Sequence, residues 1–176
     1  MRLPTLNQFF RHQLQHSFDK YGLAEPATIE YVSDVLTRFA HTRSLYAVHD
    51  RAGRPLCHVA DMLAEWHGPG YEDTPDRHRQ ASVARHVGEY TLFMSGLFRE
   101  RLKSRGELDY YMDNGRNAFL HCAYYELNPK RQSLFRGLHF NFKQIANTLD
   151  YMVRIQFPFS SKSITAHTLI TSFWRT

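Results

Sequence analysis

Residues 83–93 (VARHVGEYTLF) and 109–121 (DYYMDNGRNAFLH) decide the fold of this chain. In both stretches apolar residues recur at spacings of three and four, which is the period of an α-helix with one buried face. Polar residues stand beside that face in each of them. Because a buried polar group is costly unless it is hydrogen-bonded, such a strip marks either an internal network or a binding site.

The same helical period extends in both directions from these stretches. We expect six helices, over residues 3–21, 26–39, 56–66, 76–105, 107–126 and 131–157. Gly22 and Pro158 end the first and the last of them, and Pro26 begins the second. Residues 49–55 are expected to form a turn, since Gly53 allows a positive φ. The long fourth helix is expected at the centre, with a bend at Gly88 or Gly96.

Length and composition suit a single domain of this kind. The 176 residues are 43% hydrophobic, enough to build one sizeable core. We therefore predict an all-α, single-domain bundle of about six helices over residues 1–158. Residues 159–176 are rich in Ser and Thr and lack helical periodicity, so we expect an extended or loosely ordered tail there.

The cellular setting is predicted from features that the sequence lacks. No segment approaches the roughly 20 apolar residues that a membrane span needs. The first residues show no secretory signal pattern. Cys57 and Cys122 are isolated, and we expect both to be reduced, buried thiols. These observations favour a cytoplasmic protein.

Positive charge is concentrated in the last quarter of the chain. Residues 130–176 hold seven Lys or Arg against Asp150 alone, whereas residues 1–129 carry a net charge of −1. This excess allows binding to a nucleic acid or an acidic partner. We consider nucleic acid the less favoured partner, because Phe140 and Phe142 are expected to face the core rather than stacked bases.

The polar strips of the two central helices form the candidate site. His86 and Glu89 lie at the edge of the apolar face of one helix, and Tyr110, Asn114 and His121 lie beside the small-residue face of the other. If the two helices pack, Glu89 orients or charges His86, and Tyr110 and Asn114 supply hydrogen-bond donors. Arg116 is then available to an anion nearby. The ligand-binding set predicted here is His86, Glu89, Tyr110, Asn114, Arg116 and His121.

This strip can be a structural hydrogen-bond network in a packed interface, with no ligand. If it is a functional site, two interpretations stay open. The one we prefer is a non-enzymatic binding or interaction module, whose partner is a protein, a small molecule or a second copy of the chain. The other is a metal- or haem-dependent enzyme, because the chain has eleven histidines and imidazole is a common metal ligand. No Glu-x-x-His pair and no His-Glu-x-x-His motif is present, so we predict no metal ligands and assign no cofactor or catalytic residue.

One pattern within the two stretches has a resemblance to known proteins. It consists of Arg85-His86-Val87-Gly88-Glu89 with Leu92-Phe93 and Gly96, followed by Asp109-Tyr110-Tyr111 with Gly115-Arg116. The pattern resembles that of small uncharacterised bacterial helical proteins and covers about a quarter of the chain. The resemblance implies an all-α bacterial cytosolic protein, and it implies no activity, substrate or catalytic residue.

Overall fold

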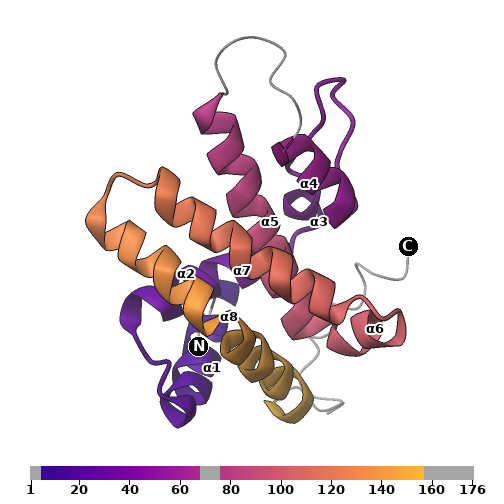
Figure 1. Ribbon diagram of the computed structural model, residues 1–176. Helices are drawn as coiled ribbons and strands as arrows, with labels where there is room; N and C mark the ends of the chain where they lie inside the picture. Colours follow the sequence, from indigo (N-terminus) through magenta and orange to yellow (C-terminus); the bar gives the residue numbers. More distant parts are fainter. Residues whose placement is uncertain (1–4, 68–75, 157–176) are drawn as a thin grey trace.

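The structure, a computed structural model, describes residues 5–67 and 76–156. Within these ranges the chain forms eight helices and no strand (Figure 1). They are α1 (Leu6–Tyr21), α2 (Pro26–Phe39), α3 (Thr42–Leu45), α4 (Val59–His67), α5 (Arg77–Leu97), α6 (Arg99–Ser104), α7 (Leu108–Tyr125) and α8 (Pro129–Gln156). The all-α prediction is confirmed. The predicted tail, residues 159–176, lies outside the described residues.

Most helix ends lie where the sequence predicts them. A capping box formed by Thr5 and Gln8 starts α1, and Gly22 ends it with a left-handed φ of 69°. Pro26 is the first residue of α2. The expected turn is also present, because His49 and Pro55 form an isolated bridge around Gly53, whose φ is 79°.

Two features differ from the prediction. The expected helix over residues 76–105 is two helices, separated at Phe98, where φ is −119° and ψ is 30°. Helix α5 continues through Gly88 and Gly96, where the sequence suggested a bend. A further short helix, α3, follows α2 and has too few residues to show periodicity.

Helix α5 is the centre of the bundle. It contacts α2, α4, α6, α7 and α8, and residues 86–96 are all buried (Figure 1). Its core face packs against aromatic and aliphatic side chains of the surrounding helices, among them Phe39, Phe119 and Leu149. The burial of a whole helical segment explains why its sequence is apolar on nearly every side.

Glycines allow α5 to approach its neighbours closely. A Cβ atom at Gly88 would lie 2.9 Å from the ring of Phe119, and one at Gly96 would lie 2.7 Å from Leu149 Cβ. A Cβ atom at Gly115 of α7 would overlap Thr91 Oγ1 and the ring of Phe142. Both distances are shorter than van der Waals contact, so these positions have no room for a side chain.

The two cysteines differ in their exposure. Cys122 is buried as expected, but Cys57 is exposed, because it precedes α4 in an open loop. None of the described helices has both the length and the apolar character that spanning a membrane requires.

Candidate functional site

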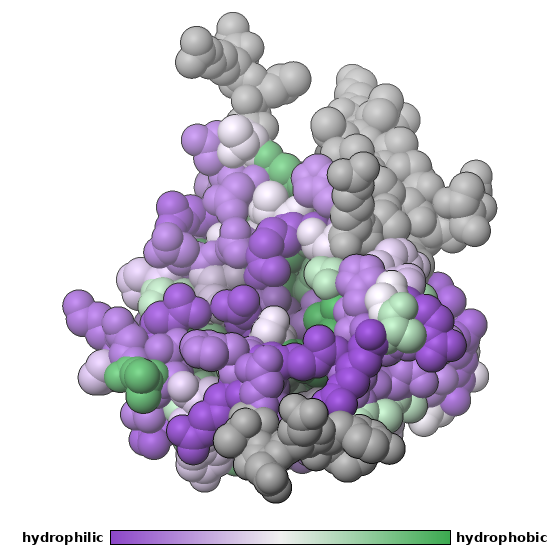
Figure 2. Space-filling view, turned by 90° about the horizontal axis from the view of Figure 1, so that it is seen from above, coloured by the Kyte–Doolittle hydropathy of each residue, from purple (hydrophilic) through white to green (hydrophobic). Residues whose placement is uncertain are grey.

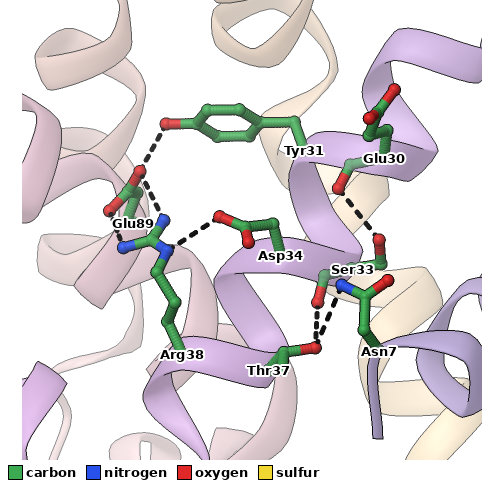
Figure 3. Close-up of polar contacts among 8 residues, drawn as sticks. All are labelled: Asn7, Glu30, Tyr31, Ser33, Asp34, Thr37, Arg38 and Glu89. Carbon is green, nitrogen blue, oxygen red and sulfur yellow. Dashed lines mark hydrogen bonds and ion pairs between the residues drawn. The ribbon is translucent and has the colours of Figure 1, made fainter. Parts of the chain in front are cut away.

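Glu89 is a carboxylate buried in the centre of the bundle. It lies on α5 and is only 3% exposed. The Tyr31 hydroxyl donates to Glu89 Oε1 over 2.6 Å, and Arg38 Nη1 donates to Glu89 Oε2 over 3.1 Å (Figure 3). Arg38 Nη2 also lies 3.0 Å from Oε1. Both carboxylate oxygens are therefore compensated, as a buried charge requires.

The partners of Glu89 come from one face of α2. Tyr31, Asp34 and Arg38 are spaced by three and four residues, which places them on the same side of that helix. Arg38 Nε donates to Asp34 over 2.8 Å while its other nitrogens reach Glu89. Burial alone would lower the pKa of Arg38, but its hydrogen bonds and charge contact with Glu89 outweigh burial and raise it. Burial, together with Glu89, also raises the pKa of Tyr31.

His86 is buried one turn before Glu89, in an aromatic environment. Its ring packs edge-on against Phe39, with centroids 5.7 Å apart, and stacks on Tyr90 at 6.1 Å. It hydrogen-bonds to the backbone of Leu45, while Nε2 has no hydrogen-bond partner within the described residues. Burial lowers the pKa of His86, although the charge of Glu89 acts in the opposite direction. The imidazole is therefore neutral at pH 7.

The predicted partners on α7 do not meet this pair. Tyr110 is 45% exposed, and the Asn114 side chain donates to the Tyr110 carbonyl in its own helix over 2.8 Å. Arg116 is exposed. His121 packs edge-on against Trp66 of α4, with ring centroids 4.8 Å apart. The expected arrangement of His86 and Glu89 against Tyr110, Asn114 and His121 is thus not formed.

The reason is the way in which α5 and α7 pack. Gly88 faces Phe119, and Gly115 faces Thr91, so the two helices are in close contact at these positions and the predicted polar residues do not meet there. The polar strip of α5 is turned toward α2 instead. Sequence reasoning missed Tyr31, Asp34 and Arg38, although their shared face on an otherwise apolar helix was a signal that could have found them.

A groove of about 750 Å³ lies over the Glu89 ion pair. It is formed by α1, α2, α5 and α8, and charged side chains of both signs line it. The lining residues are Asn7, Arg11, Ala27, Glu30, Tyr31, Asp34, Arg38, Arg85, Glu89, Arg131 and Leu134. Because Tyr31 and Arg38 are held by Glu89, this part of the groove is rigidly organised.

Arg85 and Arg131 also line a second, smaller hollow of about 180 Å³, formed by α5, α7 and α8. Arg131 Nε donates to Glu126 over 3.0 Å, which leaves its terminal nitrogens without a described partner. Arg85 is exposed and has no ion pair within the described residues. Both hollows are thus lined by two guanidinium groups with donors that have no hydrogen-bond partner among the described residues.

Metal ligands do not gather in the part of the chain that the structure describes: no three His, Cys, Asp or Glu side chains there lie close enough to share an ion. The metal-dependent alternative therefore stays a prediction without a described ligand set, and the haem-dependent one, which needs only one or two axial ligands, stays a prediction too. Three comparisons, with protein-family models, with curated proteins and with solved structures, found no match to the chain.

Proposed function

We propose that this protein is a non-enzymatic binding module, and that its ligand lies in the groove formed by α1, α2, α5 and α8. The ligand carries an acidic group, a carboxylate or a phosphate, which is held between Arg85 and Arg131. The observation that carries this proposal is that Arg85 lines both hollows without an ion pair within the described residues.

The chemistry of guanidinium groups supports an acidic ligand. Arginine presents its N–H donors in a planar fork that matches carboxylate and phosphate oxygens. Arg85 and Arg131 come from different helices, α5 and α8, so an anion between them is contacted from two sides. Acidic side chains in the groove do not compete for Arg85, since Glu89 and Asp34 are bound to Arg38 and Glu30 lies 3.7 Å from Arg11.

Surface character also favours recognition by polar groups. Figure 2 shows that the face seen from above is mainly hydrophilic, with hydrophobic residues in small, separate areas. The lining of the groove is mostly charged or hydrogen-bonding. We therefore propose that specificity comes from placed charges rather than from a broad apolar contact.

Anion titrations test this proposal. Citrate and pyrophosphate, a carboxylate and a phosphate probe, are titrated by calorimetry into the wild-type protein and into an Arg85→Gln/Arg131→Gln variant. We expect saturable binding to wild type and at least a tenfold loss in the variant. An Arg77→Gln/Lys143→Gln variant removes the same charge from exposed positions outside the groove and is expected to bind as wild type does.

Two results contradict the proposal. One is the absence of saturable binding of both probes to the wild-type protein. The other is an equal loss in the groove variant and the control variant, because that pattern indicates general attraction to positive charge.

A second candidate function, nucleic-acid binding by α8, is favoured by one observation. Phe140, expected in the core, is 78% exposed and lies between the exposed cations Arg136 and Lys143. An exposed aromatic ring beside basic residues suits base stacking. Binding to a single-stranded oligonucleotide that weakens steeply with salt and is reduced by Phe140→Ala supports this candidate; salt-independent or absent binding contradicts it.

The location of the protein, its origin and its assembly are proposed on the same basis. We propose a cytoplasmic protein of bacterial origin, in line with the resemblance of its central pattern, and a ligand that is a small molecule or a segment of a partner protein. Assembly with a second copy is tested by measuring the mass of the protein in solution across a hundredfold range of concentration.

A further inference from the structure

A separate hollow, of about 180 Å³, lies away from the groove and shares no lining residue with it. It is bounded by α5, α6, α7 and the segment between α3 and α4. Its lining residues are Leu45, Tyr46, Cys57, His58, Tyr90, Met94, Arg101, Leu102, Arg105, Glu107 and Tyr111. Neither the ion pair of Glu89 nor the proposed function uses this hollow.

The inner wall of the hollow is apolar and aromatic. Leu45, Met94 and Leu102 are each at most 4% exposed. The rings of Tyr90 and Tyr111 lie beside them with centroids 6.3 Å apart, and Tyr46 is 40% exposed. Aromatic faces and a thioether are favourable neighbours for a flat ring.

Hydrogen-bond donors converge on the same space. The phenol groups of Tyr90 and Tyr111 are hydrogen-bonded to each other. The Tyr111 hydroxyl is protonated at neutral pH, since the ordinary pKa of a tyrosine is about 10 and burial raises that of Tyr111 further. A protonated phenol can donate to an anionic oxygen, which an ionised one cannot.

Two arginine side chains give this hollow a positive charge. Arg101 and Arg105, four residues apart, both line it, and both act electrostatically on Tyr111. Arg105 is exposed and forms no ion pair within the described residues. Among the described lining residues Glu107 is the single acidic one, so the cations outnumber it.

The volume limits the size of a ligand. At roughly 30 Å³ per water molecule, the hollow of about 180 Å³ holds about six waters. That is the size of one substituted ring, and it is below the roughly 300 Å³ at which pockets for drug-sized ligands begin. This volume matches a benzoate-sized molecule better than a nucleotide.

We propose that this hollow binds a small aromatic acid, with its ring against Tyr90, Tyr111 and Met94 and its carboxylate at Arg105. This site is independent of the groove, because the two share no residue. The aromatic wall selects a planar ring, and the guanidinium together with the Tyr111 hydroxyl selects the anionic group.

Benzoate is the probe for this site, and cyclohexanecarboxylate and benzyl alcohol are its matched controls. The first control keeps the charge without the flat ring, and the second keeps the ring without the charge. We expect benzoate to bind the full-length protein with a millimolar Kd by ligand-observed NMR, and each control to bind at least fivefold more weakly.

Variants locate the binding. We expect Arg105→Gln to weaken benzoate binding at least tenfold and Tyr111→Phe, which removes only a hydroxyl, to weaken it about threefold. Arg77→Gln, an equal loss of charge at an exposed position, is expected to have no effect. The Arg85→Gln/Arg131→Gln variant is also expected to bind benzoate as wild type does. Thermal melts of each variant verify the fold.

Four outcomes overturn this inference. They are no detectable binding of benzoate, equal binding of benzoate and cyclohexanecarboxylate, unchanged binding in folded Arg105→Gln, or loss of binding in the groove variant. The last outcome would indicate that the aromatic acid binds in the groove instead. A groove that fails to bind citrate and pyrophosphate leaves this inference standing, so the two proposals fail separately.

Discussion

Helix α5 meets α7 and α2 by different physical means. Against α7, Gly88 of α5 lies beneath the ring of Phe119, and Gly115 of α7 lies against Thr91 of α5, so that the two backbones come close. Against α2, helix α5 places the buried carboxylate of Glu89, which binds a guanidinium and a phenol. The first interface depends on shape and tolerates no added atom. The second depends on charge, and it lies under the groove that we propose binds a ligand.

The two interfaces of α5 therefore differ in what a substitution there changes. A substitution at Gly88 or Gly115 of the α5–α7 interface changes the packing and removes none of the described lining residues of the groove. A change at the α5–α2 interface affects both the fold and the groove, because Tyr31 and Arg38 belong to each. Free energies of unfolding of the variants below put this difference to the test.

The largest effect is expected from Gly115→Ala. The added methyl group would overlap Thr91 and Phe142, so the helices must move apart, at a cost of about 3 kcal/mol in the free energy of unfolding. Gly137→Ala is the matched control, since nothing lies within 4 Å of its Cβ position. That control is expected to stabilise the protein by up to about 1 kcal/mol. Equal responses in denaturant unfolding would refute the close packing described here.

The next effect concerns the ion pair. Arg38→Met leaves the carboxylate of Glu89 buried with only the Tyr31 hydroxyl as partner. We expect a loss of about 2 kcal/mol, less than for a fully buried pair, because the Arg38 side chain is 40% exposed. An Arg38→Met/Glu89→Leu variant removes both charges and is expected to recover most of that loss. A double variant no more stable than Arg38→Met argues against a buried charge as the cause.

Tyr31→Phe isolates a single hydrogen bond at the same interface. Removing the hydroxyl that donates to Glu89 over 2.6 Å is expected to cost about 1.5 kcal/mol. Tyr124→Phe removes a hydroxyl from a residue that is 70% exposed and is expected to change little. Chemical denaturation of both variants measures the difference. A cost for Tyr31→Phe that matches the cost for Tyr124→Phe contradicts the hydrogen bond.

Acid is expected to lower the free energy of unfolding by protonating His86, which packs against Phe39 of α2. Burial lowers the pKa of His86 below its unfolded value of about 6.5, so the unfolded chain binds this proton more readily. The stability that depends on the neutral imidazole is complete above that value. It is lost as the pH falls below about 6.5, by at most about 1.4 kcal/mol per pH unit.

Unfolding measured between pH 7 and pH 5 tests this expectation. His86→Gln is expected to be less stable at pH 7 and to lose less stability on acidification than wild type. His12→Gln, a change at an exposed position, is the control and is expected to follow the wild-type curve. Parallel curves for wild type and His86→Gln would show that His86 does not carry the pH dependence.

The smallest effect on stability is expected from Arg85→Gln. The side chain is exposed and has no ion pair within the described residues, so its loss changes the free energy of unfolding by less than about 0.5 kcal/mol. The same variant is expected to reduce the binding of citrate. Thermal melts with and without citrate measure both effects, and a large loss of stability would assign Arg85 to the fold instead.

Local pattern was enough to predict the helices but not all of their ends. The breakers Gly22 and Pro26 mark real boundaries, because a left-handed φ and a preset φ are local properties of those residues. Phe98, where α5 ends, carries no such signal. The structure shows the break through the backbone angles of Phe98, whose ring packs against Phe93, and through the start of α6 at the next residue.

The candidate site shows a similar division. Burial of His86 and Glu89 follows from their place on a helix that is apolar on nearly every side, and both are buried. The same uniform burial removes the information about direction, since a helix with neighbours all around presents no preferred polar face. Sequence pattern therefore allows Glu89 to pair with α7, and the position of Arg38 shows that it pairs with α2 instead.

By itself, the sequence determined that this chain is an all-α bundle around a long helix, and that a carboxylate and an imidazole lie inside it. Periodicity, helix caps and glycine positions are local, and they are written in neighbouring residues. The packing of the helices sets the direction of Glu89 toward α2. It also places Arg85 and Arg131 at the same two hollows, and Tyr90, Tyr111 and Arg105 at a third. Those contacts join residues far apart in the chain, and their geometry depends on the packing of all the helices together.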